Sequence, residues 1–218
     1  MQLNTVIFDM DGLLIDSEPL WNEAATTVFT RYDIHLTAVQ YASTTGMRTK
    51  EFIHWWFNHF KMPVDDLAFI ENQIIDKVIE LVQQKGRPMP GLAHIFNFFI
   101  DRKFKIGLAS SSPSSLINVV VDQLQLRGYL DAVSSAAELK HGKPHPEVYL
   151  NCAAELGALP HECICFEDSF PGLIAVKAAG MKCVLVPDPG RSKDPRWSAA
   201  DLKISSLQNF NELLLQSL

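Results

Sequence analysis

The sequence predicts an α/β fold in which a parallel sheet carries helices on both faces and a helical domain is inserted after the first strand. Three observations support this prediction. Short apolar runs that end in turn residues recur along the chain, and helical patterns alternate with them. A long stretch near the beginning, residues 17–85, contains helical patterns only. Alternating strands and helices are typical of a parallel sheet, because each crossover connection packs a helix onto it.

The predicted strands are short, apolar and rich in residues that favour β-structure. Wholly apolar runs of this kind are typical of strands that are buried on both faces of a parallel sheet. A weaker run of the same type occurs near Ala132–Ser134. The clear runs are Thr5–Asp9, Lys105–Ser110, Cys163–Glu167 and Lys182–Pro187.

The helices between these strands have recognisable ends. Ser112 followed by Pro113 predicts an N-cap and the first turn of a helix. Two further helices begin at Pro146 and at Pro171, and a glycine ends each of them. The tail, Leu207–Leu218, is predicted to be a short closing helix.

The predicted inserted domain contains three helical patterns and no strand-like run. A cluster of glycine and proline residues at 86–91 follows it and marks the return of the chain to the sheet. The predicted domains are therefore a core of residues 1–16 and 86–218 and an α-helical cap of residues 17–85. The helical patterns of the cap are Leu20–Tyr32, Thr49–Phe60 and Leu67–Gln84.

The composition is that of a globular protein and argues against several classes of partner. The chain has 218 residues, of which 47% are hydrophobic, and a net charge of −6. The sequence has no basic patch for a nucleic acid, and its apolar runs are too short to cross a membrane. The first residues lack the pattern of a signal peptide, so we expect a cytoplasmic protein. We also expect a monomer. The four cysteines form no CxxC pair and are expected to be buried, reduced thiols.

Two carboxylates and a glycine follow the first predicted strand, as Asp9, Asp11 and Gly12. Ligands of open α/β sheets bind at the carboxyl ends of strands, and residues i and i+2 of an extended segment point to the same side. Two like charges held together are unfavourable unless a cation joins them or one keeps its proton. The pair indicates either a site for a hard metal ion or a nucleophile beside a general acid/base. The alternative is an acidic turn at the surface.

Two other junctions between strand and helix carry candidate phosphate ligands. Ser110 is the first polar side chain after its apolar run, where its hydroxyl and the following backbone N–H groups can hold an anionic oxygen. Lys143 lies between a glycine and a proline just before a helix, and a fixed ammonium can neutralise a phosphoryl group. The alternatives are helix capping by the serines and an exposed lysine in a loop.

A third strand also ends in carboxylates. In a parallel sheet, Glu167 and Asp168 fall on the same edge as Asp9 and Asp11. With one lysine they leave about three uncompensated charges, and each unit-charge pair at ~4 Å is worth roughly 4 kcal/mol at an effective dielectric near 20. A phosphate dianion therefore needs a divalent cation to approach, and oxygen ligands with open positions suit Mg²⁺.

These residues, in this order, resemble the four motifs of the haloacid dehalogenase superfamily. The motifs are Asp9-x-Asp11-Gly12, Ser110, Lys143 before a proline, and Glu167-Asp168, and the likeness runs from Val6 to about Pro187. Asp9–Glu18 and Gly142-Lys143-Pro144 look most like the branch that contains β-phosphoglucomutase and sugar-phosphate phosphatases. The resemblance implies a Rossmann-like core and, in this branch, an α-helical cap inserted after the first motif.

The resemblance also implies a role for each motif residue. Asp9 would attack phosphorus and form an aspartyl-phosphate, while Asp11 would act as general acid and then as general base. The implied ligands of Mg²⁺ are Asp9, the backbone carbonyl of Asp11, Asp168 and, directly or through water, Glu167. The implied ligands of the phosphoryl oxygens are Ser110, Ser111 and Lys143.

Specificity is expected from the cap. A cap loop with a glycine and an arginine reaches the substrate in this branch, and Gly46 with Arg48 resembles that loop. Arg48 would grip a second anionic or polyhydroxyl group, and the alternative is a solvated arginine at a helix start. Trp21, also a candidate substrate contact, stands where phosphoglucomutases of the branch carry a histidine twelve positions after the nucleophile. Its presence favours transfer of the phosphoryl group to water.

The sequence therefore predicts a Mg²⁺-dependent phosphatase for small phosphomonoesters, and the resemblance makes hexose and other sugar phosphates the expected substrates. The alternative is a β-phosphoglucomutase-type isomerase, against which Trp21 weighs. A dehalogenase would need neither Asp11 nor the metal. A phosphorylated signalling receiver would lack both Asp11 and the helical insertion.

Overall fold

The computed structural model describes residues 3–218 and contains a six-stranded, wholly parallel sheet with the strand order β3-β2-β1-β4-β5-β6. The predicted parallel sheet is confirmed, and residues 1–2 of the predicted core lie outside the described residues. The sequence analysis missed β6, because an edge strand of two residues leaves no pattern. The strands are β1 (Thr5–Phe8), β2 (Lys105–Ser110), β3 (Ala132–Ser135), β4 (Cys163–Glu167), β5 (Lys182–Leu185) and β6 (Leu202–Lys203).

The register brings the carboxyl ends of the three central strands to one level. Phe8 of β1 lies opposite Leu108 of β2 and Phe166 of β4. The N–H of Asp9 donates to the carbonyl of Phe166 at 3.0 Å and so continues the β1–β4 ladder by one residue. The polar residues that follow these strands are therefore held at a single edge of the sheet.

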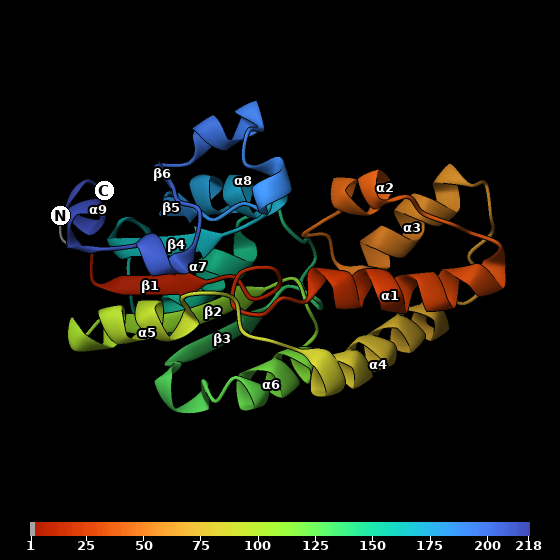
Figure 1. Ribbon diagram of the computed structural model, residues 1–218, viewed down its shortest axis with the longest axis horizontal. Helices are drawn as coiled ribbons and strands as arrows, with labels where there is room; N and C mark the ends of the chain where they lie inside the picture. The colour runs from red at the N-terminus through yellow and green to blue at the C-terminus, as the bar shows by residue number, and fades with distance from the viewer. Residues whose placement is uncertain (1–2) are drawn as a thin grey trace.

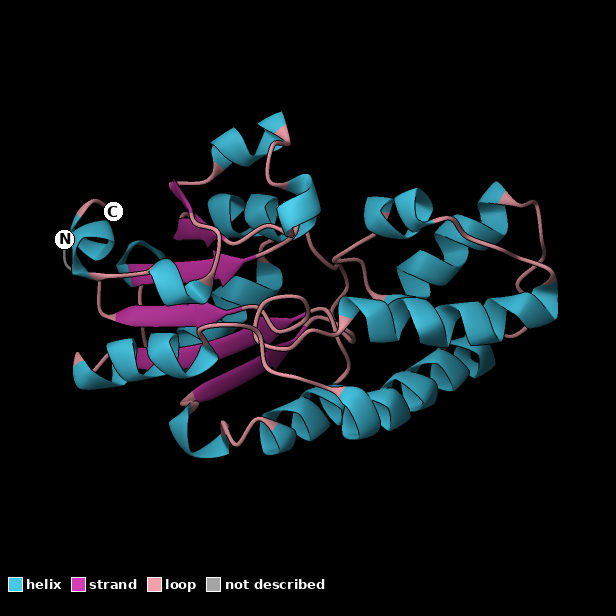
Figure 2. Cartoon of the chain, in the orientation of Figure 1, coloured by secondary structure: helices cyan, strands magenta, loops and turns pink. Residues whose placement is uncertain are grey.

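Helices cover both faces of the sheet. Successive side chains of a strand point to opposite sides, so each strand packs against helices on both faces. Phe8 packs against one pair of helices, with its ring 5.1 Å from that of Phe96. Ile7 belongs to a second cluster on the other face, together with Cys152 and Leu173. The first pair is α5 (Leu92–Asp101) and α6 (Ser114–Gln123), and the second is α7 (Glu147–Glu155) and α8 (Phe170–Ala178), as Figures 1 and 2 show.

The tail is helical over a shorter length than the sequence pattern predicts. A 3₁₀ turn at Leu207–Asn209 precedes the closing helix α9 (Glu212–Gln216). Between them Phe210 has an extended backbone and a fully buried ring, which packs edge-on against Phe166. Burial of this ring interrupts the helix, because tertiary packing outweighs the local helical preference.

The segment of residues 17–85 is helical, as predicted, and lies beyond the carboxyl edge of the sheet (Figure 1). Its own packing includes Phe29 and Phe57, whose rings meet edge to face at 5.5 Å. One hydrophobic cluster runs from this packing to the sheet, so the division into two domains at residues 16–17 and 85–86 stays a prediction. The helices are α1 (Glu18–Phe29), α2 (Ala38–Ser43), which the sequence analysis missed, α3 (Thr49–His59) and α4 (Leu67–Lys85).

We call this helical segment the cap. The two connections that join the cap to the sheet run side by side (Figure 2). Ile15 forms an antiparallel bridge with Pro88. The N–H of Asp16 donates to Arg87 at 2.9 Å, and the N–H of Met89 donates to Leu14 at 2.9 Å. The chain therefore leaves and re-enters the core through one hydrogen-bonded pair of segments.

The remaining sequence predictions concern cysteines, membranes and partners. All four cysteines are buried and free. Within residues 3–218, no helix combines the length and the apolar character needed to cross a membrane. A monomeric, cytoplasmic protein without a nucleic-acid partner stays a prediction.

Candidate active site

A cavity of about 190 Å³ lies between the carboxyl edge of the sheet and the cap. It collects side chains from both parts, and its residues come from segments that are far apart in the sequence. Most of the predicted site residues line it: Asp9, Asp11, Trp21, Gly46, Ser110, Ser111, Lys143 and Asp168. Within residues 3–218, the predicted site residues that do not line it are Arg48 and Glu167.

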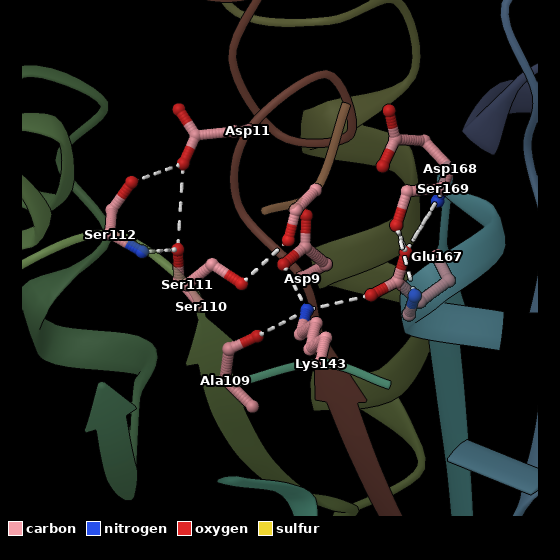
Figure 3. A network of polar contacts seen from close by, with 12 residues as sticks. Asp9, Asp11, Ala109, Ser110, Ser111, Ser112, Lys143, Glu167, Asp168 and Ser169 are labelled. Atoms are coloured by element: carbon pink, nitrogen blue, oxygen red, sulfur yellow. Dashed lines mark hydrogen bonds and ion pairs between the residues drawn. The ribbon is translucent and has the colours of Figure 1, made fainter. Parts of the chain in front are cut away.

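Lys143 is buried beneath the cavity between two carboxylates (Figure 3). Its ammonium lies 2.6 Å from an Asp9 oxygen and 2.6 Å from a Glu167 oxygen. It also donates to the hydroxyl of Tyr149 at 3.0 Å and to the carbonyl of Ala109 at 3.2 Å. A buried charge is tolerated only when it is paired and fully hydrogen-bonded, and Lys143 meets this condition.

Burial and the neighbouring charges set the ionisation of these three groups. Burial raises the pKa of Asp9 to about 7, the nearby Lys143 opposes the rise, and Glu167 and Asp11 add to it. Burial alone would lower the pKa of Lys143, but Asp9 and Glu167 hold it above its ordinary value. Burial works against Glu167 as well, but Lys143 and the hydroxyl of Tyr149 keep its pKa low. The Lys143–Glu167 pair is therefore ionised at neutral pH.

Glu167 is fixed by five hydrogen bonds from the protein. Its Oε1 accepts from Lys143 and Tyr149, each at 2.6 Å. Its Oε2 accepts at 3.0 Å from the N–H of Asp168 and from both the N–H and the hydroxyl of Ser169. A Cβ at Gly172 would overlap this carboxylate, so a glycine is needed where α8 passes it. These bonds aim Glu167 at Lys143, and its binding to a metal, directly or through water, stays a prediction.

Asp9, Glu167 and Asp168 form a cluster that fits a hard cation. One oxygen of each carboxylate lies within 4.8 Å of the others, and all three residues are buried. Within residues 3–218, the one cation that pairs with the cluster is Lys143, and it pairs with Asp9 and Glu167. Burial, followed by the charges of Glu167 and Asp9, raises the pKa of Asp168 well above its usual range. A divalent cation would relieve this repulsion with the all-oxygen ligands that Mg²⁺ prefers.

Gly12 makes room for Asp168. Its φ is +75°, and a Cβ at this position would overlap an Asp168 oxygen. A residue with a side chain would therefore be both strained and in steric conflict with the carboxylate. The glycine of the first motif thus brings the Asp11 turn against the carboxylate that follows β4.

Asp11 is held by donors from two directions, on the side of the cavity opposite Asp168 in Figure 3. One oxygen accepts from the hydroxyl of Ser17 at 2.7 Å and from the indole N–H of Trp21 at 2.9 Å. The other accepts from the hydroxyls of Ser112 at 2.7 Å and Ser110 at 3.4 Å. Trp21 belongs to α1 of the cap, so the cap contributes directly to the environment of Asp11.

The prediction that Ser112 caps a helix is wrong. The helix α6 begins at Ser114, two residues later, and Pro113 occupies the N-cap position. The hydroxyl of Ser112 bonds to Asp11 instead, and its N–H donates to the hydroxyl of Ser110 at 3.0 Å. The serine run after β2 therefore serves the cavity, where the hydroxyls of Ser110 and Ser112 both donate to Asp11.

Of the two substrate-binding residues predicted in the cap loop, one lies in the cavity and one lies outside it. Gly46 lines the cavity, and its carbonyl accepts from the hydroxyl of Ser111 at 2.9 Å. The guanidinium of Arg48 donates to the carbonyls of Ala136 at 3.2 Å and Leu139 at 2.6 Å, and it forms an ion pair with Glu51. Arg48 therefore joins the cap to the core, and its contact with a substrate stays a prediction.

Several residues at this site escaped the sequence analysis. Arg191, in a 3₁₀ turn after β5, pairs with Glu18 at 3.0 Å and donates to the carbonyl of Ala42 at 3.2 Å. Some of them adjoin or lie near predicted site residues in the sequence: Ser17, Glu18, Asn22, Thr45, Thr49, Ser112 and Ser169. Tyr41, Tyr149 and Arg191 have no such signal, because elements distant in the sequence bring them to the site.

Comparison with known proteins identifies the family. Residues 6–186 match the family described as haloacid dehalogenase-like hydrolase. The chain belongs to this family. The resemblance inferred from the four motifs is thereby confirmed. A haloacid dehalogenase-like hydrolase is expected to carry its catalytic residues at the carboxyl edge of its sheet, where the cavity lies.

Other members of the family resemble the chain over nearly its full length. Hexitol phosphatase B of Escherichia coli is 38% identical over 207 residues, which cover 94% of this chain and 93% of that protein. Fructose-1-phosphate phosphatase of Escherichia coli is 31% identical over 183 residues, which cover 82% of this chain and 94% of that protein.

Solved structures show the same fold. A β-phosphoglucomutase from Clostridium difficile superposes with a TM-score of 0.88 at 22% identity and covers 99% of this chain and 96% of its own. CbbY from Rhodobacter sphaeroides superposes with a TM-score of 0.90 at 22% identity over the whole of both chains. These likenesses confirm the predicted Rossmann-like fold of this hydrolase.

Proposed function

We propose that this hydrolase is a Mg²⁺-dependent phosphatase that releases phosphate from monoesters of sugars or hexitols. The observation that carries the proposal is the different setting of the two carboxylates of the first motif. Asp9 lies beside the ammonium of Lys143 and close to Asp168, whereas Asp11 is held by hydroxyl and indole donors. Such a division suits a nucleophile and a general acid/base. The phosphatases named among its relatives support the same activity.

The proposed reaction has two steps. A carboxylate oxygen of Asp9 forms a bond to phosphorus while the bond from phosphorus to the ester oxygen breaks, and Asp11 gives its proton to the leaving alcohol. Water then attacks phosphorus, Asp11 takes the proton of that water, and the bond to Asp9 breaks to release phosphate. Asp9 and Asp11 return to their starting states, so the cycle balances.

The other predicted site residues bind the phosphoryl group and the metal ion. Lys143 neutralises charge on the transferring phosphoryl group, and the hydroxyls of Ser110 and Ser111 donate to its oxygens. Mg²⁺ would be held by Asp9, Asp168 and the backbone carbonyl of Asp11, with Glu167 as a further ligand or through water. Bound there, the ion neutralises the negative charge that a phosphate group brings to the acidic cluster.

Trp21 positions Asp11. Its indole N–H donates to the carboxylate from the cap, so Asp11 has its full set of donors only when α1 is docked on the core. Docking of the cap also excludes water from the first step. The indole takes the place of a group that could hold the phosphoenzyme for return to a sugar, which favours transfer to water.

Phosphate release from a panel of sugar and hexitol phosphates tests the proposal. We expect release in the presence of Mg²⁺, its loss with excess chelator and its return when Mg²⁺ is restored. The Asp9→Asn variant provides the control for contaminating phosphatases. Absence of release from every ester, together with interconversion of glucose phosphate isomers, would replace the phosphatase with the isomerase.

A further inference from the structure

The cap side of the cavity is free of positive charge. Of the cavity-lining residues within 3–218, Lys143 is the one cation, and its ammonium already has four partners in the core. The acidic lining residues are Asp9, Asp11, Glu18 and Asp168. Apart from Glu18, the cap contributes uncharged residues: Trp21, Asn22, Ala25, Ala38, Tyr41, Ala42, Thr44, Thr45, Gly46, Met47, Thr49, Phe52 and Ile74.

Within residues 3–218, three cations at the junction of cap and core have partners there, and none of the three lines the cavity. Arg48 binds backbone carbonyls of the core and Glu51. Lys50 donates to the carbonyl of Ala137 at 2.6 Å. Arg191 is paired with Glu18 at 3.0 Å. Each of them holds the cap against the core and does not belong to the residues that line the cavity.

From this distribution of charge we infer that the cavity accepts phosphate monoesters whose other end is uncharged and rejects substrates that carry a second phosphate group. The inference rests on the proposed phosphatase function and adds the chemical class of the substrate. A second phosphate would lose its hydration without gaining an unpaired cation, because Arg191, which contacts the wall, is already paired with Glu18. An unpaired charge placed in such an environment is strongly disfavoured, so the wall selects against it.

The same wall offers neutral hydrogen-bonding groups. Within residues 3–218, no hydrogen bond engages the side chains of Asn22 or Thr49, and both side chains line the cavity. An amide and a hydroxyl can each donate to and accept from the hydroxyl groups of a sugar or polyol. Phe52 and Met47 supply apolar surface beside them for the carbon–hydrogen faces of such a ligand. A polyhydroxyl tail thus matches the wall in polarity.

This selection also bears on the isomerase alternative. An isomerase of this kind passes the phosphoryl group from Asp9 to a second hydroxyl of a sugar monophosphate, while that hydroxyl gives its proton to Asp11. The bond from Asp9 to phosphorus breaks and the product is a bisphosphate, which must then bind again in the opposite orientation. A cavity that rejects a second phosphate disfavours both steps, whereas hydrolysis never places two phosphates in the cavity.

A matched pair of substrates tests the inference. We would measure kcat/KM for phosphate release from fructose 1-phosphate and from fructose 1,6-bisphosphate, both with Mg²⁺. The expected value for the bisphosphate is at least about tenfold lower, a difference of ~1.4 kcal/mol. A smaller difference would overturn the inference and leave the proposed phosphatase function unaffected. Absence of release from any monophosphate, in this pair or in the panel, would overturn the phosphatase and the inference together.

A variant of the cap wall tests whether a cation placed in the lining changes the selection. Asn22→Lys adds a cation to the lining, and we expect it to raise the ratio of bisphosphate to monophosphate kcat/KM by about tenfold or more. Thr27→Lys adds the same charge on an exposed position of α1 outside the cavity and should leave that ratio unchanged. The inference is overturned if the two variants give the same ratio.

Discussion

The two halves of the active site are built differently. The half around Asp9 uses core residues alone, since Lys143 and Glu167 lie on loops and strands of the sheet and are buried beneath the cavity. The half around Asp11 is shared, because Trp21 and Ser17 approach from the side of the cap while Ser112 approaches from the core. Cap and core therefore contribute unequally to the two carboxylates.

This difference indicates which functions depend on the position of the cap. The contact between Asp9 and Lys143 involves core residues alone, so it does not require a docked cap. Asp11 would lose its indole donor if α1 moved away. In the proposed mechanism, proton transfer by Asp11 would therefore be coupled to closure of the cap. Four substitutions test this comparison.

The first substitution removes the nucleophile from the core half. Asp9→Asn should lower turnover by at least roughly 10⁴-fold, because an amide oxygen does not attack phosphorus. Phosphate release measures the loss, and thermal unfolding should show that the fold persists, since Lys143 keeps its pairing with Glu167. Wild-type rates in this variant would show that the nucleophile is another residue.

The second substitution opens the buried ion pair of the core half. Glu167→Ala leaves the ammonium of Lys143 without one of its two carboxylates, and the free energy of unfolding should fall by about 3–5 kcal/mol. Tyr149→Phe removes one neutral donor to the same oxygen and should cost about 1–3 kcal/mol. Urea unfolding compares the two variants. A loss for Glu167→Ala no larger than that for Tyr149→Phe would contradict the assigned role of the pair.

The third substitution separates the halves kinetically. Trp21→Phe removes the indole donor to Asp11 and should lower kcat for a sugar phosphate by roughly 10–100-fold. The loss should be smaller for p-nitrophenyl phosphate, because its leaving group needs little help from a general acid. Trp55→Phe, at a side chain that is 56% exposed on α3, is the matched control and should change neither rate. Equal losses of kcat for both esters would mean that Trp21 does not act through the general acid.

The fourth substitution weakens the contact between cap and core. Arg48→Ala removes bonds to Ala136 and Leu139, and kcat/KM should fall by about tenfold, the effect of ~1.4 kcal/mol. A docking residue affects every phosphate ester to the same extent, because closure precedes chemistry for all of them. A residue that grips the substrate would instead affect some esters far more than others. A panel of sugar phosphates distinguishes the two roles. An uneven loss of kcat/KM across the panel would favour direct binding of the substrate by Arg48.

Sequence patterns predicted the core half of the site better than the shared half. Asp9 and Asp168 follow apolar strands, and parallel pairing alone brings such residues to one edge of the sheet. Lys143 was indicated by its position between a glycine and a proline just before a helix. The direction of Arg48 and the bond from Trp21 to Asp11 depend on how the cap docks, which no local pattern encodes. Ser112 was misassigned for a related reason, since its acceptor lies 101 positions away in the chain.

The strands and most helices were predictable because their period and their ends are local features. The exceptions are short elements. The strand β6 and the helix α2 are too brief to show a period, and they exist because neighbours pair or pack with them. In the tail, burial of Phe210 replaced part of a predicted helix.

The paired connection at Ile15 and Pro88 has a consequence for how such proteins diversify. Both ends of the cap leave the core at one place and are joined there by backbone hydrogen bonds, which depend little on side-chain identity. Residues 17–85 can therefore be exchanged for another helical segment without altering the order of strands in the sheet. Such an exchange would leave the Asp9 half of the site unchanged in the core, and it would replace the residues that face the substrate together with the Ser17 and Trp21 donors to Asp11.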